Sequence, residues 1–266
     1  KSIREAYPAI SIKDIYPLVV TLRMTKDDDE VELMTQSIET TKRAIYEVMK
    51  HHEELDNEMK AEGYYDFVNS SEGKKLSFTS IIASGKNATT LHYSSNNSPI
   101  EKDSLLLMDV GCYTKHYSSD ITRTFPVSGK FTELQKKVYE IVLDCNKKCI
   151  EYAKAGITWK EINDYAKSIL AEGCKELGLI KEDSELIRYY FHSIGHSVGL
   201  DVHDPNLMNL GLLEGMVITI EPGLYIKEWG IGIRIEDNIQ ITREKAIVLS
   251  KNIIKEVKDI EAFLEK

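Results

Sequence analysis

Acidic residues stand at the ends of two apolar runs, where a strand would carry a carboxylate into a protein interior. Asp109 follows Leu-Leu-Leu-Met, and Glu221 follows Val-Ile-Thr-Ile. Asp120 comes eleven residues after Asp109, where the returning strand of a hairpin would let the two aspartates face each other. A buried carboxylate is unfavourable unless a cation or several hydrogen-bond donors replace its hydration. We therefore predict that these acids converge on a cation.

A further strand candidate, at 230–242, adds a fourth acid. Side chains alternate along a strand, so Arg234 and Glu236 are predicted to share one face. A single acid at a strand end is more often structural than functional, but four such acids favour a common site. With one imidazole, the carboxylates form a hard ligand set that suits Mn²⁺, Co²⁺, Zn²⁺ or Fe²⁺ better than a thiolate-preferring metal.

Histidines cluster in the segment 192–204, which reads HSIGHSVGLDVHD. His192, His196 and His203 alternate with glycines that allow close backbone approach, and this density favours a functional role over three separate structural ones. The glutamate that follows the first histidine of a zincin helix is absent. We expect the imidazole ligand to come from this segment and the site to be assembled from strands.

Residue spacing predicts the elements that must position these groups. A long amphipathic helix is expected from Thr25, where Thr25 and Asp28 form a capping box; its charged part at 51–60 is expected to be solvated, which excludes His51 and His52 as ligands. Residues 1–23 are expected to be extended. Further helices are predicted at 132–152 and from Thr158 to near Gly178, and strands at 77–83, 104–111, 117–126, 189–194, 216–221 and 230–242. The order of helix then strands occurs twice, which predicts one α+β domain of two similar halves.

Composition excludes several other classes. The formal net charge of −9 argues against a nucleic-acid surface, and no run approaches the ~20 apolar residues of a membrane span. Four cysteines are too few for a disulfide framework and favour a reducing compartment, so we expect a cytoplasmic protein. Cys145 and Cys149 lie on an apolar helix stripe and are predicted to be core residues rather than a metal pair; Cys112 is interpreted as an inert small side chain.

Five motifs resemble the catalytic domain of Xaa-Pro aminopeptidases and prolidases, which belong to the pita-bread metallopeptidases. In order, they are MDVG at 108–111, SDITRTFP at 119–126, GHSVGLDVHD at 195–204, IEPG at 220–223 and GIRIED at 232–237. The resemblance extends from about Thr25 to the C-terminus. It implies the pita-bread fold, with two pseudo-symmetric halves of helices over a curved antiparallel sheet, and a centre of two divalent metal ions, for which we expect Mn²⁺.

The resemblance also implies a role for each motif residue. Asp109 would bind one metal, Asp120 and Glu236 would bridge both, and His196 and Glu221 would complete the shell of the other. Glu221 would also move the proton towards the leaving amine, while His192 and His203 would hold the substrate carbonyl or its oxyanion. His92 would line the leaving-group pocket, and Arg234 is predicted to be one of the catalytic residues. His116 matches no motif residue of the family and is expected to be a solvated hairpin residue.

The expected substrates are peptides with proline at the second position. Residues 1–24 resemble the end of a separate N-terminal domain and its linker, with residues 25–266 as the catalytic domain, and the full-length form is expected to be a homodimer. The short loop between Asp204 and Ile220 has no Arg or Lys, which leaves aminopeptidase and dipeptidase specificity open. Other readings are a methionine aminopeptidase, a creatinase-like C–N hydrolase and a metal-free peptide- or histone-binding relative.

Overall fold

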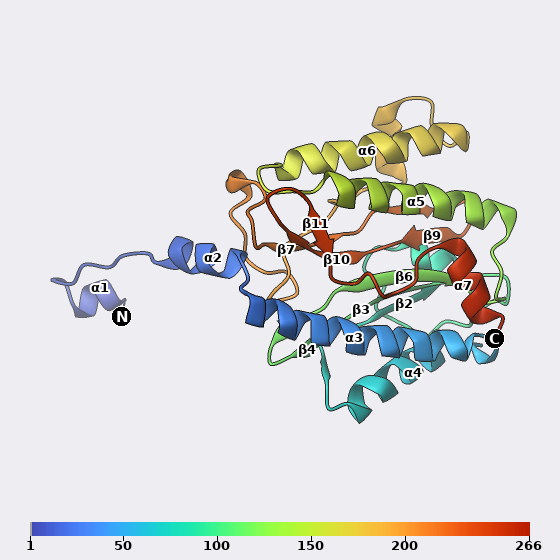
Figure 1. Cartoon of the computed structure of the whole chain (residues 1–266), viewed down its shortest axis with the longest axis horizontal. Coiled ribbons are helices and arrows are strands. Elements are labelled where there is room, and N and C mark those ends of the chain that lie inside the picture. Colours follow the sequence, from blue (N-terminus) through green and yellow to red (C-terminus); the bar gives the residue numbers. More distant parts are fainter. Residues whose placement is uncertain (1) are drawn as a thin grey trace.

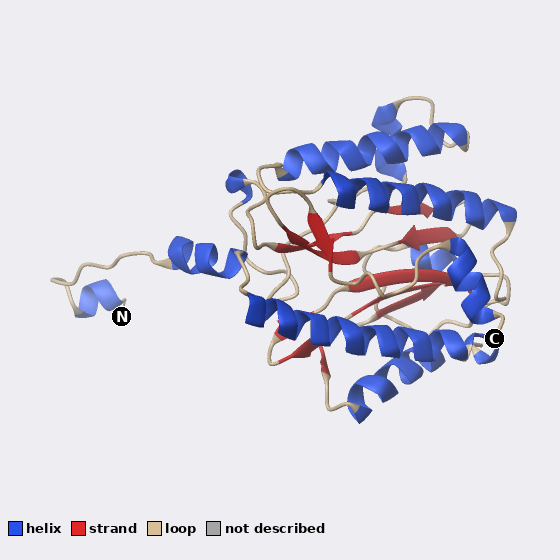
Figure 2. Cartoon of the chain, in the orientation of Figure 1, coloured by secondary structure: helices blue, strands red, loops and turns tan. Residues whose placement is uncertain are grey.

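The computed structural model describes residues 2–266 and has two similar halves, each with small antiparallel sheets covered by a pair of helices (Figure 1). Helices α3 (Asp28–Lys50) and α4 (Glu58–Ser71) cover one side, and α5 (Glu133–Tyr152) and α6 (Trp159–Glu176) cover the other. The strands lie between the two helix pairs (Figure 2). The predicted α+β class and its two halves are confirmed. No helix among the described residues is long and apolar enough to cross a membrane.

In the first half, β2 (Ile81–Ser84), β3 (Leu105–Val110) and β6 (Ile121–Pro126) form one sheet, in that order. A second small sheet contains β1 (Lys75–Leu76), β4 (Cys112–Thr114) and β5 (Tyr117–Ser118). The short hairpin of β4 and β5 connects β3 to β6, so that Asp109 pairs with Thr122 and Asp120 stands just before β6.

In the second half, one long antiparallel ribbon is interrupted in the middle. Strand β7 (Val217–Ile220) pairs with β10 (Asp237–Ile241), which also pairs with β11 (Ala246–Val248), while β8 (Gly223–Ile226) pairs with β9 (Ile231–Arg234). Ile220 faces Asp237 and Gly223 faces Arg234, so both ladders keep one register. Glu221 and Glu236 therefore lie opposite each other in the gap between the two ladders.

The core joins both halves. It contains buried residues from α3, α5 and α6 and from the strands between them, including Ile45, Val142, Ile162, Leu106 and Ile233. Cys145 and Cys149 are fully buried in it, as predicted. Helix α7 (Val257–Leu264) adds Ile260 and Leu264. The described residues also include four short 3₁₀ turns, at His52–Glu54, Gly85–Thr89, Asp183–Arg188 and Met208–Leu210.

The N-terminal segment differs from the extended chain expected from the sequence. It contains two short helices, α1 (Ile3–Ala6) and α2 (Tyr16–Met24). Pro17 lies in the first turn of α2, where a missing N–H removes no intrahelical bond. The predicted capping box at Thr25 is also wrong, because Asp27 caps α3 reciprocally with Glu30.

The long helix predicted beyond residue 50 is interrupted. α3 ends at Lys50, and α4 begins at Glu58 and continues to Ser71, where the sequence indicated no helix. His52 is buried rather than solvated, because its ring nitrogens lie 2.8 Å from Val127 O and 3.0 Å from Leu264 O. It bridges the first half to α7 and lies away from the cluster of acids.

Four strand predictions are also corrected. The run 117–126 is divided between β5 and β6, with residues 119 and 120 outside both. Residues 189–194 form no strand and follow the 3₁₀ turn Asp183–Arg188 as irregular chain, in which the Ile194 N–H donates to the Asn163 side chain rather than to a neighbouring strand. The run 77–83 is a strand only from Ile81. The segment 230–242 is divided between β9 and β10, because residues 235 and 236 lie in the gap of the ribbon.

Candidate metal centre and active site

The four acids predicted as ligands come together from both halves. One potential ligand atom each of Asp109, Asp120 and Glu236 lies within 4.8 Å of the others, and the same holds for His196, Glu221 and Glu236. The ribbon gap places Glu221 and Glu236 side by side on one face. Like charges directly opposite on paired strands repel each other, so this arrangement favours a cation between them.

Burial makes the need for a cation stronger. Burial and the carboxylates of Asp109 and Glu221 raise the pKa of Asp120 well above its ordinary value, and burial and Asp120 do the same to the pKa of Glu236. Burial also raises the pKa of Glu221. Among the described residues, the buried Oδ1 of Asp109 has no hydrogen-bond partner. An oxygen-rich donor set with one imidazole and an orphaned carboxylate oxygen fits hard divalent cations.

Neighbouring side chains orient the two aspartates. The guanidinium of Arg234, 1% exposed, donates to Asp109 Oδ2 at 2.6 Å and to Thr122 Oγ1 at 3.1 Å. Thr122 in turn donates its hydroxyl proton to Glu236 Oε2 at 2.6 Å. The Asn238 amide accepts from the backbone N–H of Asp120 and donates to its carbonyl, at 3.1 and 2.8 Å.

The histidine segment approaches the acids through glycine. A Cβ on Gly195 would lie 2.1 Å from Thr219 O, so only glycine allows this backbone contact. His196 then places Nε2 3.2 Å from Asp120 Oδ2 and 3.5 Å from Glu221 Oε1. Its Nδ1 lies 3.1 Å from Ser197 O, and an Nδ1–H bound there leaves Nε2 free to ligate a metal.

The other two histidines of the segment flank this centre. The ring centroid of His203 lies 4.2 Å from that of His196. His192 Nδ1 lies 2.8 Å from Ser193 O and 3.8 Å from Glu221 Oε2, and its Nε2 lies 2.9 Å from the Tyr225 hydroxyl. Burial, with Arg234 nearby, lowers the pKa of His192 to about 4, so this imidazole is neutral at pH 7.

All nine residues predicted for the site line one cavity of about 670 Å³. They are Asp109, Asp120, Glu221, Glu236, His92, His192, His196, His203 and Arg234. Apolar side chains, including Phe78, Ile81, Leu91 and Val202, form another part of the wall. His116 lies in the β4–β5 hairpin, exposed and stacked on Tyr113, as expected. Cys112 is buried against Thr41 and the Ser37 carbonyl, which agrees with an inert side chain.

Tyr225 is a site residue that the sequence did not reveal. It is 2% exposed, and its hydroxyl lies between His192 Nε2 and Arg234 Nη1, both at 2.9 Å. Its position in the apolar run of β8 indicates only a buried strand. The contact with Arg234 depends on the pairing of β8 with β9, which the sequence pattern does not specify.

The fold and the carboxylate cavity are those of a metallopeptidase, and comparison with known proteins identifies the family. Residues 32–243 match metallopeptidase family M24. The chain belongs to this family, and membership implies divalent metal ions.

Curated relatives agree. The chain is 36% identical to an Xaa-Pro aminopeptidase of Haemophilus influenzae over 95% of this chain and 64% of that protein. It is 35% identical to the mitochondrial intermediate cleaving peptidase 55 of Arabidopsis thaliana over 95% of this chain and 54% of that protein. The chain thus spans between about half and two thirds of the length of these relatives.

Solved structures support the pita-bread fold. Aminopeptidase P from Escherichia coli, in complex with the inhibitor Pro-Leu, superposes with a TM-score of 0.90 at 33% identity, over 95% of this chain and 62% of that one. A Bacillus anthracis protein assigned as an aminopeptidase P superposes with a TM-score of 0.96 at 46% identity, over 99% of this chain and 63% of that one. The fold predicted from the motifs is therefore confirmed.

Proposed function

We propose that residues 25–266 are the catalytic domain of a dinuclear-metal exopeptidase that hydrolyses the bond between an N-terminal residue and proline, and that residues 1–24 link it to a preceding domain. The observation that supports this most is the convergence of five ligand side chains from both halves on one cavity. The similarity to an Xaa-Pro aminopeptidase over 95% of the chain supports the choice of substrate.

The ligand shell that we propose uses every acid of the centre. Asp109 would hold one metal ion, His196 and Glu221 would hold the other, and Asp120 and Glu236 would be shared between the two. We propose Mn²⁺ as the metal, since the set combines hard oxygens with a single imidazole. When bound, a pair of divalent cations activates a water molecule and polarises the scissile carbonyl.

The protein's own groups then position the substrate and move the proton. Glu221 is largely buried and accepts a hydrogen bond from the Thr219 hydroxyl at 3.1 Å. We propose that its carboxylate acts as the general base and later protonates the leaving amine. His203 can donate to the carbonyl oxygen as negative charge develops on it. The single N–H of neutral His192 donates to Ser193 O and its Nε2 faces the Tyr225 hydroxyl, so we propose that His192 helps to hold the substrate beside His203. Arg234 holds Asp109 in place through their 2.6 Å ion pair.

The nature of a proline bond explains why a cavity suits this substrate. The bond to proline is a tertiary amide without an N–H, so proteases that pair with an extended substrate strand handle it poorly. Here the apolar side chains Phe78, Ile81, Leu91 and Val202 offer a wall against which the pyrrolidine ring can pack. His92, on the same cavity, is proposed to line the leaving-group side.

Two broader features are part of the proposal. We propose a homodimer for the full-length protein. We also propose the cytoplasm as its compartment, because all four cysteines are free, including Cys145 and Cys149 with their sulfurs 4.0 Å apart.

The function is tested by substrate comparison. The purified protein, loaded with Mn²⁺, is assayed for release of the first residue from Xaa-Pro dipeptides, from longer Xaa-Pro-Yaa peptides and from Met-Ala-Ser. We expect cleavage of the proline peptides, whereas preferential cleavage of Met-Ala-Ser would indicate a methionine aminopeptidase. Turnover of none of them, with less than one metal per chain, would refute the enzyme proposal.

Two variants test the roles within the site. Glu221→Ala and His203→Ala are each expected to abolish hydrolysis, because the first removes a ligand and proton carrier and the second a donor to the carbonyl oxygen. Positioned acid–base groups and oxyanion donors each contribute roughly 10²–10⁴-fold to rate. Near-normal rates in either variant would contradict its assigned role.

A further inference from the structure

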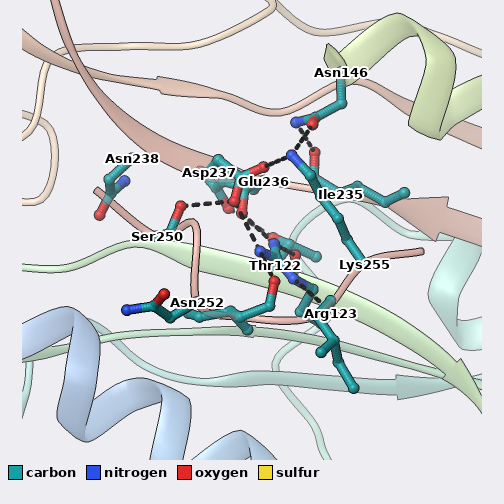
Figure 3. A network of polar contacts seen from close by, with 12 residues as sticks. Thr122, Arg123, Asn146, Ile235, Glu236, Asp237, Asn238, Ser250, Asn252 and Lys255 are labelled. Carbon is teal, nitrogen blue, oxygen red and sulfur yellow. Dashed lines mark hydrogen bonds and ion pairs between the residues drawn. The ribbon is translucent and has the colours of Figure 1, made fainter. Parts of the chain in front are cut away.

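Asn146 is a polar side chain placed on the buried face of α5. It is fully buried, and the neighbouring inward residues Val142, Cys145 and Cys149 are fully buried as well. A buried amide is unfavourable unless its donors and acceptor have partners. All of them do here. Nδ2 donates to Ile220 O at 3.1 Å. It also donates to Ile235 O at 3.3 Å, and Oδ1 accepts from Lys255 at 2.7 Å (Figure 3).

The contact with Ile235 compensates for a missing backbone donor. The shared register of the two ladders places Pro222 opposite Ile235, and the Ile235 N–H donates to Pro222 O at 3.2 Å. In an antiparallel ladder the opposite residue would return this bond, but proline has no N–H. The Ile235 carbonyl therefore lacks its ladder partner, and the Asn146 amide donates to it instead.

These carbonyls directly precede the two opposed glutamates. Ile220 is followed by Glu221 and Ile235 by Glu236, in the gap where no regular ladder holds the chain. One amide from α5 therefore contacts both peptides from which the glutamates extend. Mutual repulsion of the two carboxylates would push these peptides apart in the absence of a cation.

A buried charge network fixes the amide in turn. Lys255 donates to Asn146 Oδ1 and also forms a 2.6 Å ion pair with Asp237, the residue after Glu236. Asp237 further binds Arg123 at 2.8 Å and accepts the Ser250 hydroxyl proton at 2.6 Å (Figure 3). Arg123 donates to the Glu236 carbonyl at 2.6 Å. The Asn146 side chain thus cannot rotate away without breaking contacts on both of its ends.

We propose that Asn146 is a positioning residue of the metal centre: it replaces the backbone N–H that Pro222 lacks and so holds Glu221 and Glu236 in the geometry that binds metal. This inference rests on the metal site of the proposed function. Side chains that orient ligands without touching the metal typically contribute about 10–100-fold to metal affinity.

The test measures Mn²⁺ binding by titration calorimetry, without peptide, so that it does not depend on turnover. Asn146→Ala is expected to raise the dissociation constant for Mn²⁺ by about 10–100-fold. The matched control is Cys149→Ala, another truncation on the buried face of α5, with no contact to residues 220–222 or 235–236 among its hydrogen bonds. It is expected to lower thermal stability and leave Mn²⁺ affinity unchanged.

A second substitution tests the replacement of the N–H itself. Pro222→Ala restores a backbone N–H opposite Ile235, so the double variant Asn146→Ala/Pro222→Ala should regain part of the lost Mn²⁺ affinity. A residue with a purely structural role in α5 would show no such rescue. A double variant that binds no better than Asn146→Ala would therefore overturn the inference.

The remaining outcomes also decide the matter. If the unsubstituted protein binds no Mn²⁺, the metal site itself is refuted. If it binds Mn²⁺ and folded Asn146→Ala binds equally well, or loses no more affinity than Cys149→Ala, only the role of Asn146 is refuted. Should Asn146→Ala fail to fold, Lys255→Met takes its place, since it removes the donor that orients the amide; weaker Mn²⁺ binding supports the inference and unchanged binding overturns it.

Discussion

Asp204 directly follows His203 and holds two cations of the segment that precedes α3. Lys26 Nζ lies 3.0 Å from Asp204 Oδ2, and both side chains are only 1% exposed. Arg23 binds the other oxygen, but its side chain is 27% exposed and it has a second partner, Asp201, at 2.7 Å. Asp204→Asn would remove the charge without changing the shape, and the buried Lys26 ammonium would lose its ion-pair partner and keep only the more distant charge of Glu30.

The expected loss of stability comes mainly from the buried Lys26 ammonium, which loses its ion-pair partner. Removing one partner of a buried ion pair destabilises a protein by about 3–5 kcal/mol. Arg23 adds little, because it is partly hydrated and keeps Asp201. For a protein of this size each kcal/mol changes the melting temperature by about 2–4 °C, so Asp204→Asn should melt about 6–20 °C lower.

The pH dependence has a definite sign. Burial already lowers the pKa of Lys26 below 10.5, against the opposing effect of Asp204, and the variant loses that opposing group. Between the folded pKa and 10.5 the unfolded chain binds the proton that the folded chain has released, so folding stability rises with pH. The destabilisation is therefore largest below the folded pKa of Lys26 and decreases as the pH rises towards 10.5.

Thermal and urea unfolding followed by far-UV circular dichroism, at pH 7 and pH 9, measures both effects. The control is the double variant Lys26→Met/Asp204→Asn, which removes the stranded ammonium and should be more stable than Asp204→Asn alone. The reasoning is refuted if Asp204→Asn loses less than about 1 kcal/mol, the value of an exposed pair. It is equally refuted if the double variant is no more stable than the single one.

Three further predictions concern the site and the core. Gly195→Ala should lower Mn²⁺ affinity and destabilise the fold by about 1–3 kcal/mol or more, because the new Cβ would meet Thr219 O at 2.1 Å. The control is Gly63→Ala, in α4 with open space around it, which should stabilise the fold by about 0.5–1 kcal/mol. Calorimetry for Mn²⁺ binding and thermal melts for stability compare the two variants. Chelation with EDTA should lower the melting temperature, and added Mn²⁺ should restore it. At a hundredfold excess over the dissociation constant, Mn²⁺ should raise the free energy of unfolding by about 2.7 kcal/mol. An unchanged melting temperature would contradict a native metal site. Burial raises the pKa of Cys174 to about 11, so the folded state keeps a thiol proton that the unfolded state loses above the ordinary pKa of 9.0. The free energy of unfolding should therefore fall between pH 9 and 11, with a shallower slope in Cys174→Ala. An identical slope in both proteins would exclude Cys174 as the cause of the pH dependence.

Much of the candidate site could be read from the sequence because its signals are local. Asp109 and Glu221 stand at the ends of apolar runs, and His196 lies between glycines, so a few consecutive residues show both burial and polarity. Alternation along a strand also predicted that Arg234 and Glu236 point to the same side, and both line the cavity. These features depend on the chain's own periodicity and need no knowledge of what packs against it.

Only the tertiary structure decided how these groups are held. Tyr225, the Lys26–Asp204 pair and the amide of Asn146 look like ordinary core, linker and helix residues in the sequence, and the burial of His52 contradicted the charged run around it. The sequence by itself determined which residues are candidate metal ligands, because residue type and local spacing encode that candidacy. The fold decided which buried polar groups satisfy one another. Asn146 and Ile220 are 74 residues apart, and Tyr225 meets Arg234 only through the pairing of β8 with β9, so no periodic pattern connects these partners.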